Sequence, residues 1–138
     1  MKLEQKSKIL IVNNSITIFN TIKDLLERFN CDISLFYAKT GSDAITKINT
    51  EPGINLIITG LKLDDYTGIT IANHIRKFRS IPIIIFTDYE RNFDSYIDND
   101  ILYWKRNGYK EHPQEFIKAL TLKLKNSFSN QFIGNFSF

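Results

Sequence analysis

The chain contains little cysteine, little histidine and no long apolar run, and each absence excludes a class of protein. Cys31 is the only cysteine among 138 residues, so no internal disulfide is possible, and a lone cysteine suits a reducing cytoplasm. No apolar run approaches the roughly 20 residues that a membrane-spanning helix needs. The polar residues 1–8 are not followed by a signal-peptide core. We therefore expect an intracellular, cytoplasmic protein.

Motifs for metal binding and for catalysis are also missing. His74 and His112 are the only histidines, and neither has a second histidine or cysteine at the spacing of metal ligands. The chain has no hydrolase nucleophile pattern and no glycine-rich phosphate loop. We expect no metal site and no cofactor, and nothing in the sequence predicts an enzyme.

The composition that remains is that of one globular domain. Apolar residues make up 43% and charged residues 24%, and the length allows a single buried core. The net charge of +3 is too small to indicate nucleic-acid binding. The charges are unevenly placed, because residues 88–100 are mainly acidic and residues 105–125 mainly basic. Two solvated helix faces would explain this pattern, and so would two complementary surfaces.

Short apolar runs alternate with amphipathic stretches along the chain. The runs are β-branched and almost entirely apolar, which is typical of strands buried on both faces. They lie at 8–12, 33–38, 54–59, 81–86 and 101–104. Apolar residues at helical spacing predict helices between and after them. These helices lie at 15–29, 43–49, 68–79 and 113–124.

Two segments fit this alternation less well. Residues 88–100 carry Phe93, Tyr96 and Ile97 at helical spacing, which predicts the missing fourth helix, but their many Asp and Asn residues favour caps and turns. The tail, residues 126–138, is rich in Ser, Asn and Phe, and its composition argues against a stable helix. We therefore predict a domain over residues 1–125 followed by a separate tail.

The predicted order is a strand and a helix repeated five times. Such alternation with short connections indicates a doubly wound, five-stranded parallel sheet between two helical layers, an α/β sandwich of the flavodoxin type. The working crevice of such folds lies at the carboxyl ends of the strands. The residues predicted there are Asn13, Asn14, Gly60, Thr87 and Lys105.

Several segments resemble the receiver domains of two-component response regulators, and the resemblance covers about residues 8–124. Residues 9–15 (ILIVNNS) are similar to the family's first strand and the acidic pair after it, with asparagine at both acidic positions. Residues 55–68 (NLIITGLKLDDYTG) are similar to the segment that carries the phosphorylated aspartate. In that register Gly60 replaces the aspartate and Gly68 is the loop glycine.

Three further segments support the resemblance. Residues 38–45 (AKTGSDAI) are similar to the exit of the second strand and the start of the second helix. Residues 81–87 (IPIIIFT) resemble the fourth strand with its hydroxyl residue, and residues 103–105 (YWK) end at the family's lysine. The proline that normally follows this lysine is Arg106, and the aromatic residue three positions before it is Leu102.

The departures from the family pattern decide the expected chemistry. The resemblance implies phosphorylation of an aspartate, which needs a carboxylate nucleophile, and Gly60 has no side chain. It also implies Mg²⁺, a hard cation held by carboxylates and water, whereas Asn13 and Asn14 offer only neutral amides. We therefore expect a vestigial phosphorylation site in which Thr87 and Lys105 remain.

The residues that remain need new roles. A buried lysine without a partner is costly, so Lys105 is predicted to contact Asp88 or to be exposed to solvent. Thr87 is best explained as a β-branched residue that ends a strand. Because Arg106 replaces proline, the peptide bond between Lys105 and Arg106 is expected to be trans, and the domain is expected to have one resting conformation.

The leading functional hypothesis is a module that acts in signal transduction by binding proteins without being phosphorylated. The resemblance implies partner contacts or a homodimer through the fourth helix, fifth strand and fifth helix, and a two-fold dimer could set the acidic helix of each subunit against the basic helix of the other. The candidate interface residues are Asp94, Asp98, Tyr103, Lys105, Lys118 and Lys125.

Three alternatives remain open. A relocated carboxylate at Asp64, Asp65 or Asp88 could accept a phosphoryl group, although it would lack a Mg²⁺ cage. The space left by Gly60 could hold a small anion or metabolite beside Thr87 and Lys105, or simply water. Direct DNA binding is disfavoured because no recognition-helix module follows the last predicted helix.

Overall fold

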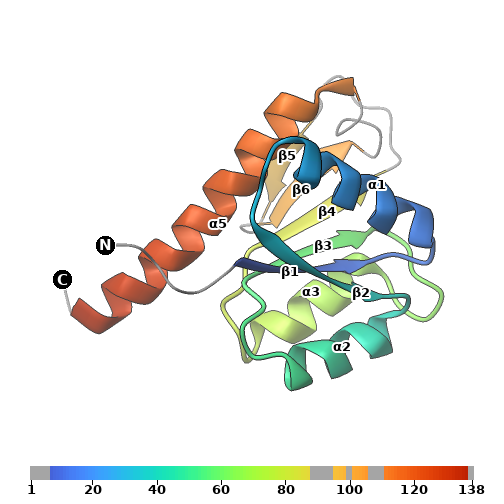
Figure 1. Ribbon diagram of the computed structural model, residues 1–138. Coiled ribbons are helices and arrows are strands. Elements are labelled where there is room, and N and C mark those ends of the chain that lie inside the picture. Colours follow the sequence, from blue (N-terminus) through green and yellow to red (C-terminus); the bar gives the residue numbers. More distant parts are fainter. Residues whose placement is uncertain (1–6, 88–94, 99–100, 106–110, 137–138) are drawn as a thin grey trace.

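One mixed β-sheet forms the centre of the computed structural model (Figure 1). The structure describes residues 7–87, 95–98, 101–105 and 111–136, with side chains at 7–86, 101–105 and 111–125. The strands are β1 (Ser7–Val12), β2 (Ile33–Ala38), β3 (Leu56–Gly60), β4 (Ile83–Thr87), β5 (Ser95–Asp98) and β6 (Ile101–Lys105). Their order is β2-β1-β3-β4-β6-β5, and all neighbours are parallel except β5 and β6.

Helices cover both faces of this sheet, so the predicted doubly wound sandwich is confirmed (Figure 1). The helices are α1 (Ile16–Arg28), α2 (Gly41–Thr50), α3 (Gly68–Arg76) and α5 (Pro113–Phe136). Successive strand residues point to opposite faces. Ile9 and Ile11 therefore pack with α1 and α5, whereas Leu10 and Val12 pack with α2 and α3. Burial on both faces explains why these strands are apolar throughout.

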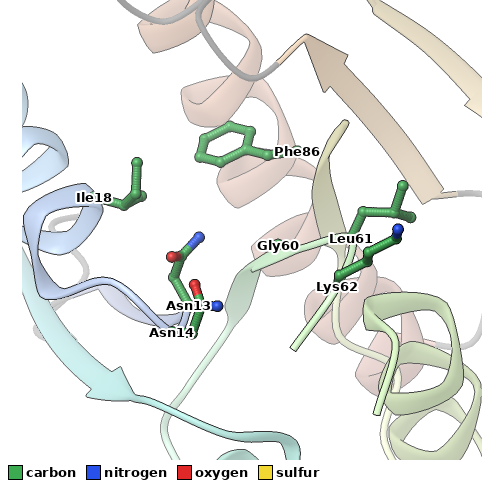
Figure 2. Close-up of a pocket in the computed structure, with 7 residues that line it drawn as sticks. All are labelled: Asn13, Asn14, Ile18, Gly60, Leu61, Lys62 and Phe86. Carbon is green, nitrogen blue, oxygen red and sulfur yellow. The ribbon is translucent and has the colours of Figure 1, made fainter. Parts of the chain in front are cut away.

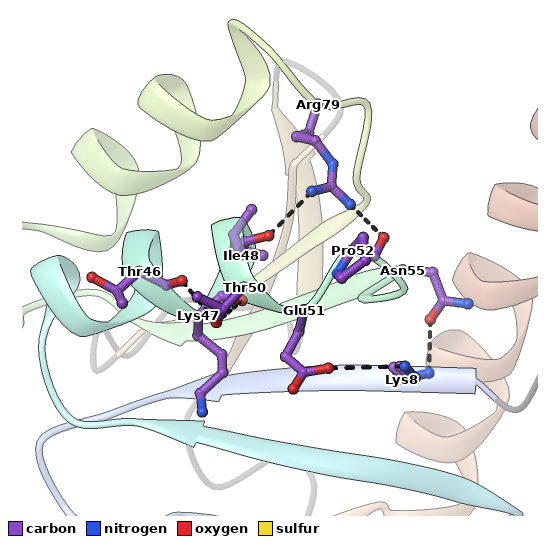
Figure 3. A network of polar contacts seen from close by, with 9 residues as sticks. All are labelled: Lys8, Thr46, Lys47, Ile48, Thr50, Glu51, Pro52, Asn55 and Arg79. Atoms are coloured by element: carbon purple, nitrogen blue, oxygen red, sulfur yellow. Dashed lines mark hydrogen bonds and ion pairs between the residues drawn. The ribbon is translucent and has the colours of Figure 1, made fainter.

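A network of polar contacts fixes the end of α2 to neighbouring elements (Figure 3). The Arg79 guanidinium donates to the carbonyl oxygens of Ile48 at 3.2 Å and Pro52 at 2.7 Å. The Lys8 ammonium lies 3.9 Å from the Glu51 carboxylate. Cationic donors are favourable at a helix C-terminus, where the last carbonyl groups lack partners in the helix. Arg79 thus joins α2 to the segment that leads from α3 into β4.

The segment predicted as a fourth helix differs from the prediction. Residues 95–98 form β5, which runs antiparallel to β6 with Ser95 opposite Trp104 and Asp98 opposite Ile101. Tyrosine and isoleucine have a high propensity for β-strands, so Tyr96 and Ile97 fit a strand as well as the helix that their spacing suggested. The other residues predicted for this helix, 88–94 and 99–100, lie outside the described residues.

The C-terminal helix is longer than predicted. Helix α5 continues from Pro113 to Phe136, across most of the segment expected to be a non-helical tail. Its first half packs on the sheet through Phe116, Leu120 and Leu124, and its second half extends past the body of the domain (Figure 1). Composition alone was misleading here, because Ser, Asn and Gly lower helix propensity by no more than about 1 kcal/mol each.

Candidate functional site

The five residues predicted to share a site lie at the same end of the sheet. Asn13 and Asn14 follow β1, while Gly60, Thr87 and Lys105 are the last residues of β3, β4 and β6. Strand register places them side by side, since Val12 pairs with Thr59, Gly60 with Phe86, and Thr87 with Lys105. The backbone therefore brings the five positions to one edge of the sheet.

A crevice of about 210 Å³ opens at this end of the sheet (Figure 2). Its lining residues are Asn13, Asn14, Ile18, Gly60, Leu61, Lys62 and Phe86. Figure 2 shows Asn13 and Asn14 on one side of Gly60 and Lys62 on the other, with Phe86 above them in this view. Of the predicted residues, Asn13, Asn14 and Gly60 line this crevice. Thr87 and Lys105 are not among its lining residues.

Hydrogen bonds fix the orientation of Asn13. Its side-chain carbonyl Oδ1 accepts a bond of 2.9 Å from the backbone N–H of Ser15, a local turn that starts α1. Its backbone carbonyl accepts a bond of 2.7 Å from the Tyr37 hydroxyl. With Oδ1 used in this way, the amide nitrogen Nδ2 faces Gly60. This side chain therefore presents a hydrogen-bond donor to the crevice.

Gly60 leaves room that a side chain would fill. A Cβ atom built at this position would lie 3.2 Å from Asn13 Nδ2 and 3.7 Å from the Lys62 carbonyl oxygen. The contact to Asn13 is tight but is made by the end of a flexible side chain, and the contact to Lys62 has an ordinary van der Waals distance. No described glycine has a positive φ, so the backbone at Gly60 does not itself require glycine.

Gly68 is a glycine for a steric reason. A Cβ built there would collide with the carbonyl oxygen of Gly60 and would lie 3.2 Å from Thr59 Cγ2. Its own N–H donates to the Leu61 carbonyl at 2.8 Å. The start of α3 is thus packed directly on the end of β3, and this packing sets the position of Leu61 and Lys62 in the crevice.

Asp65 is one of the alternative phosphoryl acceptors considered above, and its carboxylate already has a structural role. Its carboxylate accepts hydrogen bonds from the backbone N–H groups of Gly41 at 2.8 Å and Ser42 at 2.9 Å, at the start of α2. Desolvation alone would raise the pKa of this carboxyl. The bonds from Ser42 and Gly41 outweigh it and lower the pKa. Asp65 therefore caps α2 as a carboxylate, whereas Asp64 is exposed and Asp88 lies outside the described residues.

Lys105 has a partner that the sequence did not suggest. Its ammonium lies 3.8 Å from the Glu111 carboxylate, and the two side chains are 32% and 47% exposed. Lys105 is therefore neither isolated nor buried. The predicted contact with Asp88 and the predicted trans bond to Arg106 involve residues outside the described part of the chain. The side chain of Thr87 also lies outside the described side chains.

Few groups in the described part of the chain could hold a metal ion. No cluster of three His, Cys, Asp or Glu side chains occurs among those residues. His74 packs edge-on against the exposed ring of Phe78, with ring centroids 5.6 Å apart. Within the described residues, the crevice has amide and ammonium groups but no carboxylate among its lining side chains.

The candidate interface residues lie in different environments. Lys118 and Lys125 are exposed on α5, and Lys105 is partly exposed at the end of β6. Tyr103 is only 7% exposed and packs in the core on the α2 and α3 face, so it offers little surface to a partner. Asp94 lies outside the described residues, and Asp98 belongs to β5 without a described side chain.

Sequence reasoning did not assign four residues to this site. Ile18, Lys62 and Phe86 line the crevice, and Ile18 and Phe86 belong to the hydrophobic core as well. Glu111 pairs with Lys105. A lysine two residues after the end of a strand could have indicated a cation near the crevice.

The topology and the crevice define a three-layer α/β protein whose candidate site lies where the parallel strands end. Residues 9–97 match the response regulator receiver domain, and the chain belongs to this family. It is a receiver domain of two-component signalling. It is 32% identical to the protein PilG of Pseudomonas aeruginosa over 97 residues, which cover 67% of this chain and 70% of PilG.

Solved structures of receiver domains share the fold. A CheY-like receiver domain from Methanospirillum hungatei is 22% identical and superposes with a TM-score of 0.73, over 91% of this chain and 99% of that chain. A two-component response regulator from Clostridium difficile is 25% identical with a TM-score of 0.68, over 86% and 98% of the two chains. None of the described helices is long and apolar enough to cross a membrane.

Proposed function

We propose that this chain is an atypical receiver domain that acts through protein–protein contacts without phosphorylation or Mg²⁺. The observation that carries the proposal is the end of β3, where the acceptor position of the family is Gly60. The side chain nearest to it is that of Asn13, which brings an amide nitrogen, and no lining side chain in the described part of the chain is a carboxylate. A nucleophile and the ligands for a hard cation are both missing from these positions.

The alternative of a relocated acceptor receives no support from Asp65. Its carboxylate is held by two backbone N–H groups at the start of α2, so attack on a phosphodonor would remove an acceptor from these two donors and leave only the Thr40 hydroxyl to cap the helix. Lys105 likewise pairs with Glu111. Two of the groups that phosphorylation chemistry would use thus have structural partners of their own.

Restoring the carboxylates provides a test with a built-in positive control. The variant Asn13→Asp, Asn14→Asp, Gly60→Asp places three carboxylates around the crevice, and the one tight contact of a Cβ at residue 60 is to the movable end of the residue-13 side chain. Crowded carboxylates repel one another and favour a divalent cation. We expect Mg²⁺ to raise the melting temperature of the variant and to leave that of the wild type unchanged. Stabilisation of the wild type by Mg²⁺ would overturn the proposal.

Helix α5 offers the best described surface for a protein partner, and we place the homodimer contact there. Leu122 is 57% exposed, and Lys118 and Lys125 lie on the same side of the helix at positions i−4 and i+3. An exposed leucine between two lysines suits a partner surface with an apolar centre and acidic surroundings. The acidic residues 88–100 of a second copy have this charge, so a two-fold dimer would pair unlike charges.

Sedimentation at low and high salt tests this contact. We expect a dimer at high protein concentration and low salt, with association weakened by salt and by Leu122→Glu. Phe78→Glu alters another exposed apolar residue, 49% exposed and two residues after the end of α3, and should leave association unchanged. A protein that stays monomeric at low salt, or a Leu122→Glu variant that associates like the wild type, would contradict the dimer.

A further inference from the structure

Strand β2 is an edge of the sheet without the usual protection against pairing. It comes first in the strand order, so only one of its sides is covered by a neighbouring strand, β1 (Figure 1). Its sequence is ISLFYA, without proline or a charged residue, and residues 33–37 are partly exposed. Its register with β1 is continuous and has no bulge. Exposed edges of this kind are templates for another strand, and proteins that avoid such pairing place charges, proline or a bulge there.

The backbone groups on the open side of β2 are those of Leu35 and Tyr37. The Ala38 carbonyl accepts a bond of 3.0 Å from the Asn13 N–H, so the backbone groups of Ala38 face β1. Successive residues of a paired strand turn their N–H and C=O groups to opposite sides, so those of Leu35 and Tyr37 face away from β1. Within the described part of the chain, these groups make no hydrogen bond to another residue. Each of the two residues therefore offers one donor and one acceptor at the edge.

Contacts on both faces hold β2 in place. The Tyr37 hydroxyl donates to the Asn13 carbonyl at 2.7 Å, and the Tyr37 ring packs edge-on against Phe19 with the ring centroids 5.5 Å apart. On the other face, the Lys47 ammonium lies 6.0 Å from the centre of the Phe36 ring. A strand fixed in this way loses little further conformational entropy when another strand pairs with it.

We propose that β2 pairs with β2 of a second copy, antiparallel and about a two-fold axis perpendicular to the sheet, with Phe36 opposite Phe36. This symmetry keeps corresponding faces of the two sheets on the same side, so opposite residues must point to the same face. Leu35 then stands opposite Tyr37 of the second copy, and the two exchange both of their outward backbone bonds. At each end, the exposed Lys39 lies beside the exposed Asp32 of the second copy, so unlike charges meet.

The neighbouring register of the same symmetry is less favourable. It sets Leu35 opposite Leu35, and Tyr37 opposite Ile33 of the second copy. The Ile33 N–H already donates to the Cys31 carbonyl at 3.1 Å, so this register leaves the Tyr37 carbonyl without a donor. The register with Phe36 at the axis uses every outward group of Leu35 and Tyr37, and unmade backbone bonds are costly.

The β2 contact is separate from the α5 contact proposed above. It consists mainly of backbone bonds and apolar side chains, so salt should weaken it little, whereas association through α5 is weakened by salt and by Leu122→Glu. A single strand from each copy buries little area, so the β2 contact needs higher protein concentrations than the α5 contact. Measurements in the Leu122→Glu background at high salt isolate the β2 contact, and either contact can then fail without the other.

Disulfide trapping tests the contact and its register together. In this register the two residues at position 36 form a pair without backbone bonds, with Cα atoms about 4.5 Å apart, which a disulfide can span. The test variant is Cys31→Ser, Phe36→Cys, Leu122→Glu. The matched control is Cys31→Ser, Ser34→Cys, Leu122→Glu, because residue 34 lies on the same face of β2 but stands opposite Ala38 of the second copy. In a glutathione redox buffer we expect the test variant to form at least about ten times more covalent dimer than the control.

Charges placed at the axis give the second measurement, by sedimentation of the Leu122→Glu background at millimolar protein and high salt. Phe36→Glu and Phe36→Lys should each lose association, because like charges would face each other across the axis. An equimolar mixture of the two should associate again, because unlike charges then meet. Circular dichroism checks that each variant is folded, and the trapping result does not depend on them. Equal trapping at positions 34 and 36, or a mixture of folded variants as monomeric as its components, would overturn the proposal.

Discussion

Replacing Gly68 by alanine adds a single methyl group where α3 meets the end of β3. The new Cβ would collide with the carbonyl oxygen of Gly60 and come within 3.2 Å of Thr59 Cγ2. The Gly60 carbonyl belongs to a strand paired on both sides, so it cannot move without disturbing β3. No described glycine has a positive φ, so the penalty at Gly68 is steric and not conformational.

Two opposing effects set the size of the destabilisation. Inserting a methyl group into a packed region typically costs about 1–3 kcal/mol. Alanine returns about 0.4–1 kcal/mol, because it restricts the unfolded chain more than glycine does. We therefore expect Gly68→Ala to lower the free energy of unfolding by about 1–2 kcal/mol. For a domain of this size, that corresponds to a fall of about 3–10 °C in melting temperature.

Urea unfolding of Gly68→Ala beside Gly53→Ala measures this effect. At Gly53 the built Cβ meets only the side chain of Lys8, with its Cδ at 3.0 Å, and this chain can move aside in an exposed turn. The control should unfold within about 0.5 kcal/mol of the wild type. Equal unfolding midpoints for Gly68→Ala and the wild type would refute the packing argument, and with it the account of how Leu61 and Lys62 are positioned.

Two further predictions concern the ends of α2. The pKa of Asp65 is lowered in the fold, so its carboxylate stabilises the fold above the unfolded pKa of about 3.9 and loses this effect as pH falls through the folded value. Asp65→Asn should therefore have a lower melting temperature than the wild type at pH 7, and the difference should shrink in acid. The control Asp64→Asn should melt like the wild type. A melting-temperature difference for Asp65→Asn that does not change with pH would contradict this. Arg79→Ala removes two hydrogen bonds at the other end of α2 and should cost about 1–2 kcal/mol in urea unfolding. Lys77→Ala is its exposed neighbour and should cost little, so equal losses in the two variants would argue against the capping role of Arg79.

The parts of the fold that the sequence predicted correctly are those with strong periodicity. The parallel strands are continuous apolar runs bounded by turn residues, and this pattern has few other interpretations. The positions of Asn13, Gly60 and Lys105 at one end of the sheet followed from topology alone, because parallel strands end at the same edge. Their side-chain partners did not follow, since Glu111 and Ser15 are selected by local geometry that spacing does not encode.

The two errors have different causes. Residues 95–98 are too short to show a period, and pairing with β6 decided their structure. Asn99-Asp100 are two turn-forming residues between Tyr96-Ile97 and the apolar run 101–104, a hairpin signal that helical spacing obscured. In residues 126–136 the weak helix formers suggested a tail, but a helix already begun at Pro113 is extended at little cost, because nucleation is the unfavourable step.

The central claim is that the end of β3 has lost its capacity for phosphoryl transfer. Its most direct test is the intact mass of the protein after incubation with Mg²⁺ and acetyl phosphate, with the variant Asn13→Asp, Asn14→Asp, Gly60→Asp treated in parallel. We predict no added phosphoryl group on the wild type under conditions in which the variant gains one. A phosphoryl group on the wild type would contradict the claim, and peptide mapping would then identify the carboxylate that accepts it.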